Sequence, residues 1–283
     1  MKKGIYPIAI LSVTMFACNI STTVTPTVAA QPPVPQPGQV TDTPVLPSDT
    51  PIMPTDTPGV QTNTTCNELA IYLDPTLASS YTCEAIPESP EGIETYPQYT
   101  KLTLQGYPLS GKFFTPYISI LPVQRYIELL PDFIPGQVAA LQALVSGGAP
   151  GDKDLPFLPS LNAGQMFHAQ YQVLPFGSGG GVRYLTLLAQ YYAPINNHDL
   201  FYTYQGVTND GKYWVSAILP INNPILPDNG DNPPGGQTWD QFTNNYSSYI
   251  ADLTVQLNSQ ASGNYTPSLA MLDALVSSIT VQP

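Results

Sequence analysis

The sequence predicts an α+β fold, in which helices pack on an antiparallel sheet (a meander) and a disordered stalk precedes the domain. Strand patterns fill the middle of the chain, helical patterns follow them, and a Pro- and Thr-rich segment comes first. Segregated strands and helices are typical of α+β domains. Along the chain we expect a leader at 1–17, a linker at 18–65, a short helical segment between two cysteines at 66–83 and the α+β domain at 84–283.

Residues 1–17 have the pattern of an export signal: two lysines precede an apolar run that is too short to span a bilayer. The run ends at Met15-Phe16-Ala17-Cys18, which resembles the lipobox of bacterial lipoproteins, although Met15 and Phe16 depart from the usual Leu and small residue. The resemblance implies that Cys18 is acylated, so that the membrane is a partner and the domain faces outward from the cell envelope. An ordinary signal peptide with an incidental cysteine is the alternative.

Residues 19–65 contain ten Pro and twelve Thr but no aromatic residue, Lys or Arg. Such a segment buries too little apolar area to offset its ordering entropy, so we expect disorder. A [Ser/Thr]-Asp-Thr-Pro repeat recurs every seven residues, at 41–44, 48–51 and 55–58. Proline excludes a coiled coil, and a polyproline II spacer of up to ~145 Å is expected. A Pro-rich ligand for a partner is the alternative.

Cys66 and Cys83 form the cysteine pair that remains once Cys18 is acylated, and in an exported chain such a pair predicts a disulfide. The chain-entropy estimate for closing a loop of this length is about 3 kcal/mol. Between the two cysteines, residues 67–73 have a helical pattern, which suggests a short stapled helix. A metal site is the alternative reading of the two thiols.

The strands follow from alternating or β-branched runs between turn residues. Runs at 98–106 and 113–121 predict a hairpin, and 136–146 has the spacing of a helix. A four-stranded meander is then expected from 167–174, 182–190, 200–207 and 212–219, with a flexible glycine turn at 177–181 and an Asn209-Asp210-Gly211 turn between the last two. The run at 182–190 is also compatible with a buried helix.

After a polar loop at 222–236, the spacing of apolar residues changes from the alternation of strands to the period of a helix. Apolar residues recur at helical spacing over 239–257, where Thr238 and Gln241 form a capping box and Asp240 complements the helix dipole. A second helix is expected from Thr266-Pro267, and a final strand at 278–281.

The sequence of 269–279, Leu-Ala-Met-Leu-Asp-Ala-Leu-Val-Ser-Ser-Ile, resembles the C-terminal part of PsbP-like α/β/α sandwich domains. In that family a helix of this form leads through a serine into the last strand. The resemblance covers about 120 residues and implies a non-catalytic assembly or stabilising role, with no catalytic residues to transfer. The layout of lipobox, stalk, cysteine pair and α+β domain also resembles uncharacterised bacterial surface lipoproteins.

Composition excludes several functions. Charged residues make up 10% of the chain, against roughly 25% in soluble domains. Without the leader, six bases stand against 20 acids, a formal charge of −14. Scattered cations cannot form the basic stripe that phosphate backbones require, so no nucleic-acid partner is expected. Two His and three Cys make a multi-metal or haem enzyme improbable, and no cofactor is expected.

Candidate chemistry is sparse, and we expect no enzyme. His168 reads as a surface residue of its strand, and His198-Asp199 as a turn with a local hydrogen bond. Ser178 lies in a glycine run that matches neither a nucleophile elbow nor a dinucleotide loop. The Asp228–Asp231 loop has oxygen ligands but lacks EF-hand spacing, so turn chemistry is favoured over calcium.

Three functions remain. The preferred one is a cell-envelope lipoprotein that displays a non-catalytic interaction or assembly domain, with an envelope protein as partner. The second is a domain that binds a glycan or small ligand through exposed Tyr and Trp, suggested by 18 Tyr residues. The third is a hydrolase that combines His198 and Asp199 with an unrecognised Ser. An open groove lined with tyrosines would favour the second, and a Ser hydroxyl beside His198 in a pocket would favour the third.

Overall fold

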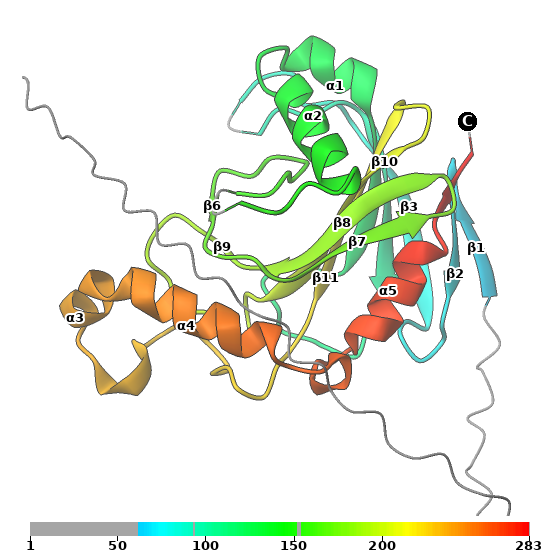
Figure 1. The fold of residues 1–283 in the computed structure, drawn as a ribbon. Coiled ribbons are helices and arrows are strands. Elements are labelled where there is room, and N and C mark those ends of the chain that lie inside the picture. Colours follow the sequence, from blue (N-terminus) through cyan, green and yellow to red (C-terminus); the bar gives the residue numbers. More distant parts are fainter. Residues whose placement is uncertain (1–61, 93, 152–153, 283) are drawn as a thin grey trace, which may run out of the picture. The chain divides into compact units, whose positions relative to one another are not determined.

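The structure is a computed structural model that describes residues 62–92, 94–151 and 154–282. The expected signal peptide, Cys18 and all of the linker up to residue 61 lie outside the described residues. The described residues belong to one compact unit (Figure 1).

A seven-stranded sheet forms the centre of the domain, and every neighbouring pair in it is antiparallel. The α+β fold class is therefore confirmed, as is the meander of the last four strands. In spatial order the strands are β3 (Ser80–Ile86), β4 (Tyr99–Gln105), β5 (Tyr117–Pro122), β11 (Tyr213–Pro220), β10 (Phe201–Thr208), β8 (Gly179–Thr186) and β7 (Ala169–Phe176).

A second sheet joins the two ends of the described chain, in the order β1 (Thr62–Cys66), β2 (Leu69–Leu73) and β12 (Thr280–Val281). A short ladder pairs β6 (Gly164–Gln165) with β9 (Leu188–Ala189). Strand β2 lies where the sequence pattern suggested a helix at 67–73, and that expectation is wrong. A helix this short has little stability of its own, whereas β2 gains a hydrogen-bonded neighbour on each side. Strand β1 also begins inside the segment assigned to the linker at 18–65.

Helices cover both faces of the central sheet (Figure 1). On one face lie α1 (Val123–Leu129), which the sequence did not predict, and α2 (Ile134–Val145), which it did. On the other lie α4 (Tyr246–Asn258), α5 (Leu269–Ser277) and the small sheet. The remaining helices are α3 (Trp239–Asn244), η1 (Pro234–Gly236) and η2 (Ser262–Asn264).

Two hydrophobic cores lie on the two faces of the central sheet, and the side chains of β10 alternate between them. Phe201 and Val207 pack in the core that includes α1 and α2, whereas Tyr202 and Tyr204 pack in the core that includes α4 and α5. Gln205 is fully buried between strands and accepts a hydrogen bond from the Trp214 indole at 2.7 Å. Because both sheet faces are covered, β10 and β11 are buried on both sides, whereas the edge strand β7 keeps exposed residues.

Three local expectations need correction. The expected helix over 239–257 is two helices that meet at Asn245, although its capping box at Thr238 is present. Helix α5 begins after Ser268, whose hydroxyl accepts from the Met271 amide, and not at Thr266-Pro267. Thr266 is instead held in a backbone bridge to Asn222.

The glycine run is the third correction. Only residues 177–178 form the turn, and β8 begins at Gly179, so the run is not a flexible turn throughout. A Cβ at Gly179 would lie 2.1 Å from the Val207 carbonyl oxygen, and one at Gly181 would lie 2.3 Å from that of Gln205. Glycine is required here because the backbone of β10 approaches closely.

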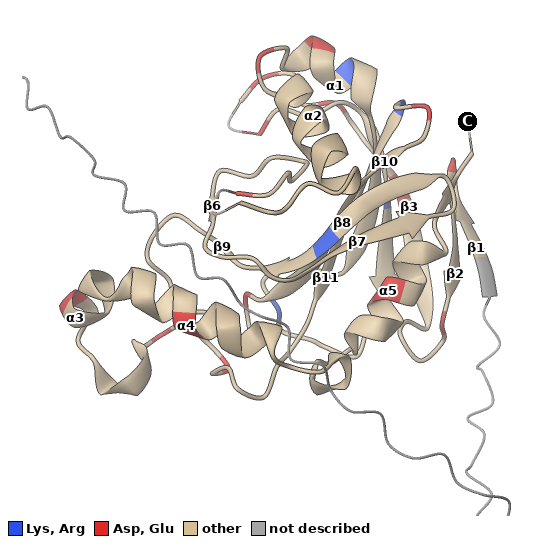
Figure 2. Ribbon diagram, viewed as in Figure 1, with Lys and Arg blue, Asp and Glu red and all other residues tan. Residues whose placement is uncertain are grey.

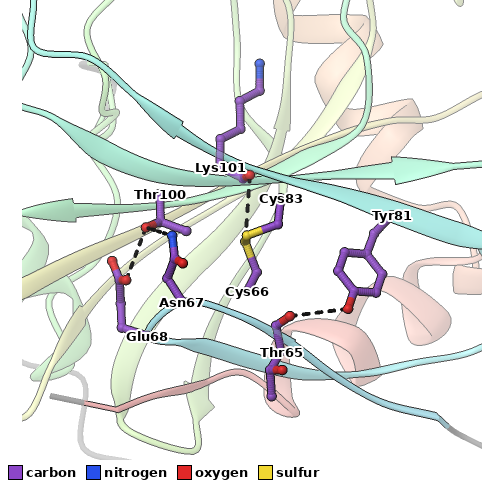
Figure 3. Close-up of a disulfide and its surroundings, with 8 residues drawn as sticks. All are labelled: Thr65, Cys66, Asn67, Glu68, Tyr81, Cys83, Thr100 and Lys101. Atoms are coloured by element: carbon purple, nitrogen blue, oxygen red, sulfur yellow. Dashed lines mark hydrogen bonds between the residues drawn. A yellow bond between two sulfur atoms is a disulfide. The ribbon is translucent and has the colours of Figure 1, made fainter.

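The cysteine pair fastens the small sheet to the central one (Figure 3). The sulfur atoms of Cys66 and Cys83 lie 2.02 Å apart, at bonding distance, which agrees with the predicted disulfide. Beside them, the Asn67 amide donates to the Thr100 hydroxyl at 3.2 Å, and that hydroxyl donates to Glu68 at 3.1 Å. The cysteines therefore connect β1 to the edge strand β3, rather than stapling a helix.

Charged residues are sparse along the described chain (Figure 2). One ion pair is buried: Arg183 of β8 lies 3.3 Å from Asp273 of α5, and the Tyr202 hydroxyl donates to the same carboxylate at 2.9 Å. Burial raises the pKa of Asp273. These contacts hold α5 against the sheet. Among the described helices, none has the length and apolar character needed to cross a bilayer.

Candidate functional site

A groove of about 660 Å³ separates α3 and α4 from the loop that precedes them. We call it the amide groove. Its helix side presents polar side chains, namely Gln241, Asn245, Ser248, Asp252 and Gln256. Its loop side is mainly apolar and presents Ile225, Leu226, Pro227, Pro234 and Gln237.

Helical geometry explains the polar side. The five polar residues are spaced by four, three, four and four positions, which places them on one face across the α3–α4 junction. Leu253 and Leu257 turn toward the core and fix the rotation of α4. Within the described residues, the side chains of Ser248, Asp252 and Gln256 make no hydrogen bond to protein, so their bonding capacity faces solvent and the groove.

The loop side is held by buried polar contacts. The Asn197 side-chain amide donates to the carbonyls of Asn223, at 3.2 Å, and Leu226, at 3.1 Å. The Lys112 ammonium reaches in from the β4–β5 connection and donates to the Asn197 carbonyl and the Asn222 side chain. Burial lowers the pKa of Lys112 to about 8. The groove wall is thus fixed by two side chains that do not line it.

A second cavity, of about 480 Å³, lies at an aromatic surface that we call the aromatic shelf: Tyr191, Tyr192 and Tyr246. Tyr191 is 66% exposed and Tyr192 is 55% exposed. The rings of Tyr192 and Tyr246 are 4.8 Å apart between centroids. The rest of the lining is Gln165, Met166, Ala189 and Gln190. Exposed large aromatics gathered at a cavity are unusual for a surface that only meets water.

Helix α4 joins the two cavities. Tyr246 lines the aromatic shelf and Tyr249 lines the amide groove, and their ring centroids are 6.0 Å apart. Both rings contact Phe242, at 5.4 and 5.1 Å. The Tyr246 hydroxyl donates to the Ala193 carbonyl at 3.1 Å, and the Tyr249 hydroxyl accepts from the Ile195 amide at 2.9 Å. Packing and hydrogen bonds therefore hold the shared aromatic wall in one arrangement.

The chemistry of this region is that of recognition. The lining of the two cavities offers amides, hydroxyls and aromatic faces, together with one carboxylate, Asp252. Burial raises the pKa of Tyr246 and of Tyr249, so both hydroxyls stay neutral near pH 7. Concave sites with aromatic faces and a few polar groups are typical of small-ligand binding.

His198 and Asp199 form the local contact that the sequence suggested. The His198 Nδ1 atom lies 2.6 Å from Asp199 Oδ1, and Asn196 donates to the other carboxylate oxygen at 2.9 Å. The His198 ring packs near Phe113. In the portion of the chain that is described, no Ser hydroxyl hydrogen-bonds to His198, so the arrangement required for the hydrolase hypothesis is not present there.

Ser178 has a structural position. Its hydroxyl accepts from the Val281 amide at 2.8 Å and donates to the Val281 carbonyl at 3.2 Å, which ties the end of β12 to the turn before β8. His168 is half-buried and precedes β7, so it lies outside the strand on which it was expected.

The Asp228–Asp231 loop follows the apolar wall of the amide groove. Its contacts are those of turns, such as the Asp231 amide donating to the Asn229 side chain at 3.3 Å. Over residues 62–92, 94–151 and 154–282, no group of three or more His, Cys, Asp and Glu side chains is placed to hold a metal ion.

Sequence reasoning did not find the two cavities. The apolar period of 239–257 predicts which side of a helix packs on the core, but not what lies opposite its polar side. The signal that was available is the recurrence of amide and hydroxyl side chains at helical spacing from Gln241 to Gln256, together with the adjacent pair Tyr191-Tyr192. Neither pattern shows that a loop stands opposite the helix.

The residues that suggested a PsbP-like domain form α5 and the two residues after it. That resemblance stays a prediction. Comparisons of the chain with protein-family models, with curated proteins and with solved structures found no match.

Proposed function

We propose that this chain is a lipid-anchored protein of the cell envelope, that it displays a non-catalytic binding domain, and that the ligand of the domain is a glycan. The anchoring part is supported by the leader and by Cys18 at the end of its apolar run. The binding part is supported by the described domain.

One observation supports a glycan above the other ligands: the aromatic shelf adjoins the amide groove through a shared wall of Tyr246 and Tyr249. Sugar rings combine a face of C–H groups, which packs on aromatic rings, with a rim of hydroxyls, which bond to amides and hydroxyls. The two cavities supply these two kinds of contact side by side. Rigid aromatic anchors of this kind dominate binding energy at recognition sites.

The test is binding of the purified full-length mature protein to an array of neutral oligosaccharides. Replacing an exposed anchor, Tyr192→Ala, should weaken binding about tenfold, the effect of losing one hot-spot contact. The matched control is Tyr72→Ala, because Tyr72 is 49% exposed but lines neither cavity. The control should bind like the parent protein.

The assembly role implied by the PsbP-like resemblance makes a different prediction. Crosslinking of the native envelope should then recover one protein partner, and the array should show no saturable binding. That pair of results would overturn the glycan proposal. Equal losses of glycan affinity in Tyr192→Ala and Tyr72→Ala would also contradict the glycan proposal, because binding would then not depend on the aromatic shelf.

A further inference from the structure

We propose that the amide groove selects amine-bearing sugars over neutral ones, and that Asp252 confers this selectivity. The inference rests on the proposed function and deepens it by naming the class of glycan. Asp252 lies on the groove side of α4, between Ser248 and Gln256, each one helical turn away.

Asp252 is the one charged residue among those that line the two cavities in the described chain. It forms no ion pair and no side-chain hydrogen bond with the described residues. The polar groups beside it, Ser248 and Gln256, are uncharged, and the opposite wall is mainly apolar, with the uncharged Gln237 as its polar residue. A carboxylate on a cavity wall accepts hydrogen bonds from sugar hydroxyls and from amines alike, but with a protonated amine it gains charge attraction as well.

The cations of the described chain are engaged elsewhere. Lys112 is bonded to the loop carbonyls, Arg183 is paired with Asp273, and Lys212 is paired with Asp210. The other two are also placed away from the groove lining, Arg125 with Glu88 and Glu128, and Lys101 over the ring of Tyr117. No described cation therefore competes for Asp252 at the groove lining.

Other acidic residues near the groove in the sequence also favour a cationic ligand. Asp231 lies on the loop that continues from the apolar wall, and Asp240 directly precedes Gln241 in α3. Asp228 lies on the same loop but interacts with the Lys112 ammonium. The field of several carboxylates attracts cations and repels anions, and a cavity wall of low polarity strengthens it. Glycans with carboxylate, sulfate or phosphate groups should therefore be poor ligands.

The experiment compares two trisaccharides that share one backbone, N-acetylglucosamine trimer and its fully deacetylated form, by titration calorimetry at about pH 6, where the amines are protonated. The purified full-length mature protein in detergent is used throughout. The deacetylated trimer should bind roughly two- to fivefold more tightly, the effect of one exposed ion pair. The preference should vanish at about 1 M salt, where the Debye length is about 3 Å.

Asp252→Asn tests the residue itself. This variant keeps the side-chain shape and should bind both trimers with the affinity that the parent has for the acetylated one. Asp231→Asn is the matched control: it removes the same charge from the neighbouring loop, but Asp231 does not line the groove. The control should keep the preference, which separates a contact at Asp252 from general attraction of a cation to an acidic protein.

The outcomes separate the two proposals. If neither trimer binds, and no neutral oligosaccharide binds on the array, the glycan proposal fails. If the trimers bind equally, or if Asp252→Asn keeps the preference, glycan binding stands and the role of Asp252 is overturned. Equal loss of the preference in Asp231→Asn and Asp252→Asn would also overturn it.

Discussion

Gly181 and Gly206 are paired residues of β8 and β10, and the ring of Tyr204 lies over both. Tyr204 is fully buried, and its hydroxyl donates to the Leu174 carbonyl at 2.9 Å. The ring occupies the space that two side chains would otherwise fill. This packing explains a pair of glycines inside strands, where glycine ordinarily costs stability.

Gly181→Ala should therefore destabilise the domain by about 1–3 kcal/mol, because the added methyl group overpacks against Tyr204 and the β10 backbone. Urea unfolding followed by circular dichroism measures the change. The control is Gly136→Ala in α2, where a Cβ would meet no atom within 4 Å. That variant should gain roughly 0.5–1 kcal/mol. A stabilised Gly181→Ala would contradict the close approach of the strands.

Asp210, in the β10–β11 turn, makes the stability of the fold depend on pH. Hydrogen bonds from the Thr208 hydroxyl and the Lys212 amide lower the pKa of Asp210 to about 2. A carboxyl whose pKa is lowered by folding stabilises the folded state above its ordinary pKa, and this stabilisation disappears as the pH falls from about 4 to about 2. In Asp210→Asn, melting temperatures should fall less steeply over that range. Parallel curves for the two proteins would disprove this role.

At the scale of elements, the segment after Cys66 shows how pairing overrides local preference. Residues 67–73 have a helical pattern, yet 69–73 form β2 because β1, next to it in sequence, and β12, distant in sequence, pair with it on either side. Asn67, with φ of 51°, makes the tight turn between β1 and β2. The cysteine bond then connects this small sheet to β3.

Replacing both Cys66 and Cys83 with Ala should lower the free energy of unfolding by about 3 kcal/mol, because the unfolded chain regains the freedom of the open loop. Thermal unfolding with and without reductant measures this loss of stability. The reductant should leave the melting temperature of the double variant unchanged. Peptide mapping of the unreduced protein should recover one crosslinked pair. Recovery of both cysteines as thiols in the exported protein would contradict the bond.

At the scale of the whole molecule, the anchor decides where the domain works. If Cys18 is acylated, mass spectrometry of the N-terminal peptide should show residue 18 as the first residue, carrying acyl chains, and Cys18→Ala should release the protein from membranes. Cys18 lies outside the described residues. An unmodified N-terminus at another residue, or unchanged membrane retention of Cys18→Ala, would remove the lipoprotein assignment.

The meander, its Asn209-Asp210-Gly211 turn, α2 and the capping box at Thr238 could be predicted because each depends on neighbours close in sequence. Turn chemistry, alternation and capping are local properties. The cysteine pair was also predictable, because Cys66 and Cys83 are the two cysteines that remain once Cys18 is taken as acylated. Of the candidate site, the sequence indicated only that exposed tyrosines would carry recognition.

The features that only the tertiary structure decided depend on contacts between residues that are far apart in the sequence. Strand β2 forms because it pairs with strands from both ends of the described chain. Glycine is needed at position 181 because the ring of Tyr204 lies against it. The amide groove required the loop at 222–237 to stand opposite α4, held there by Lys112 and Asn197. Local sequence determined which side chains α4 would present to solvent; the packing of distant segments determined that they face a groove, because only the folded chain brings those segments together.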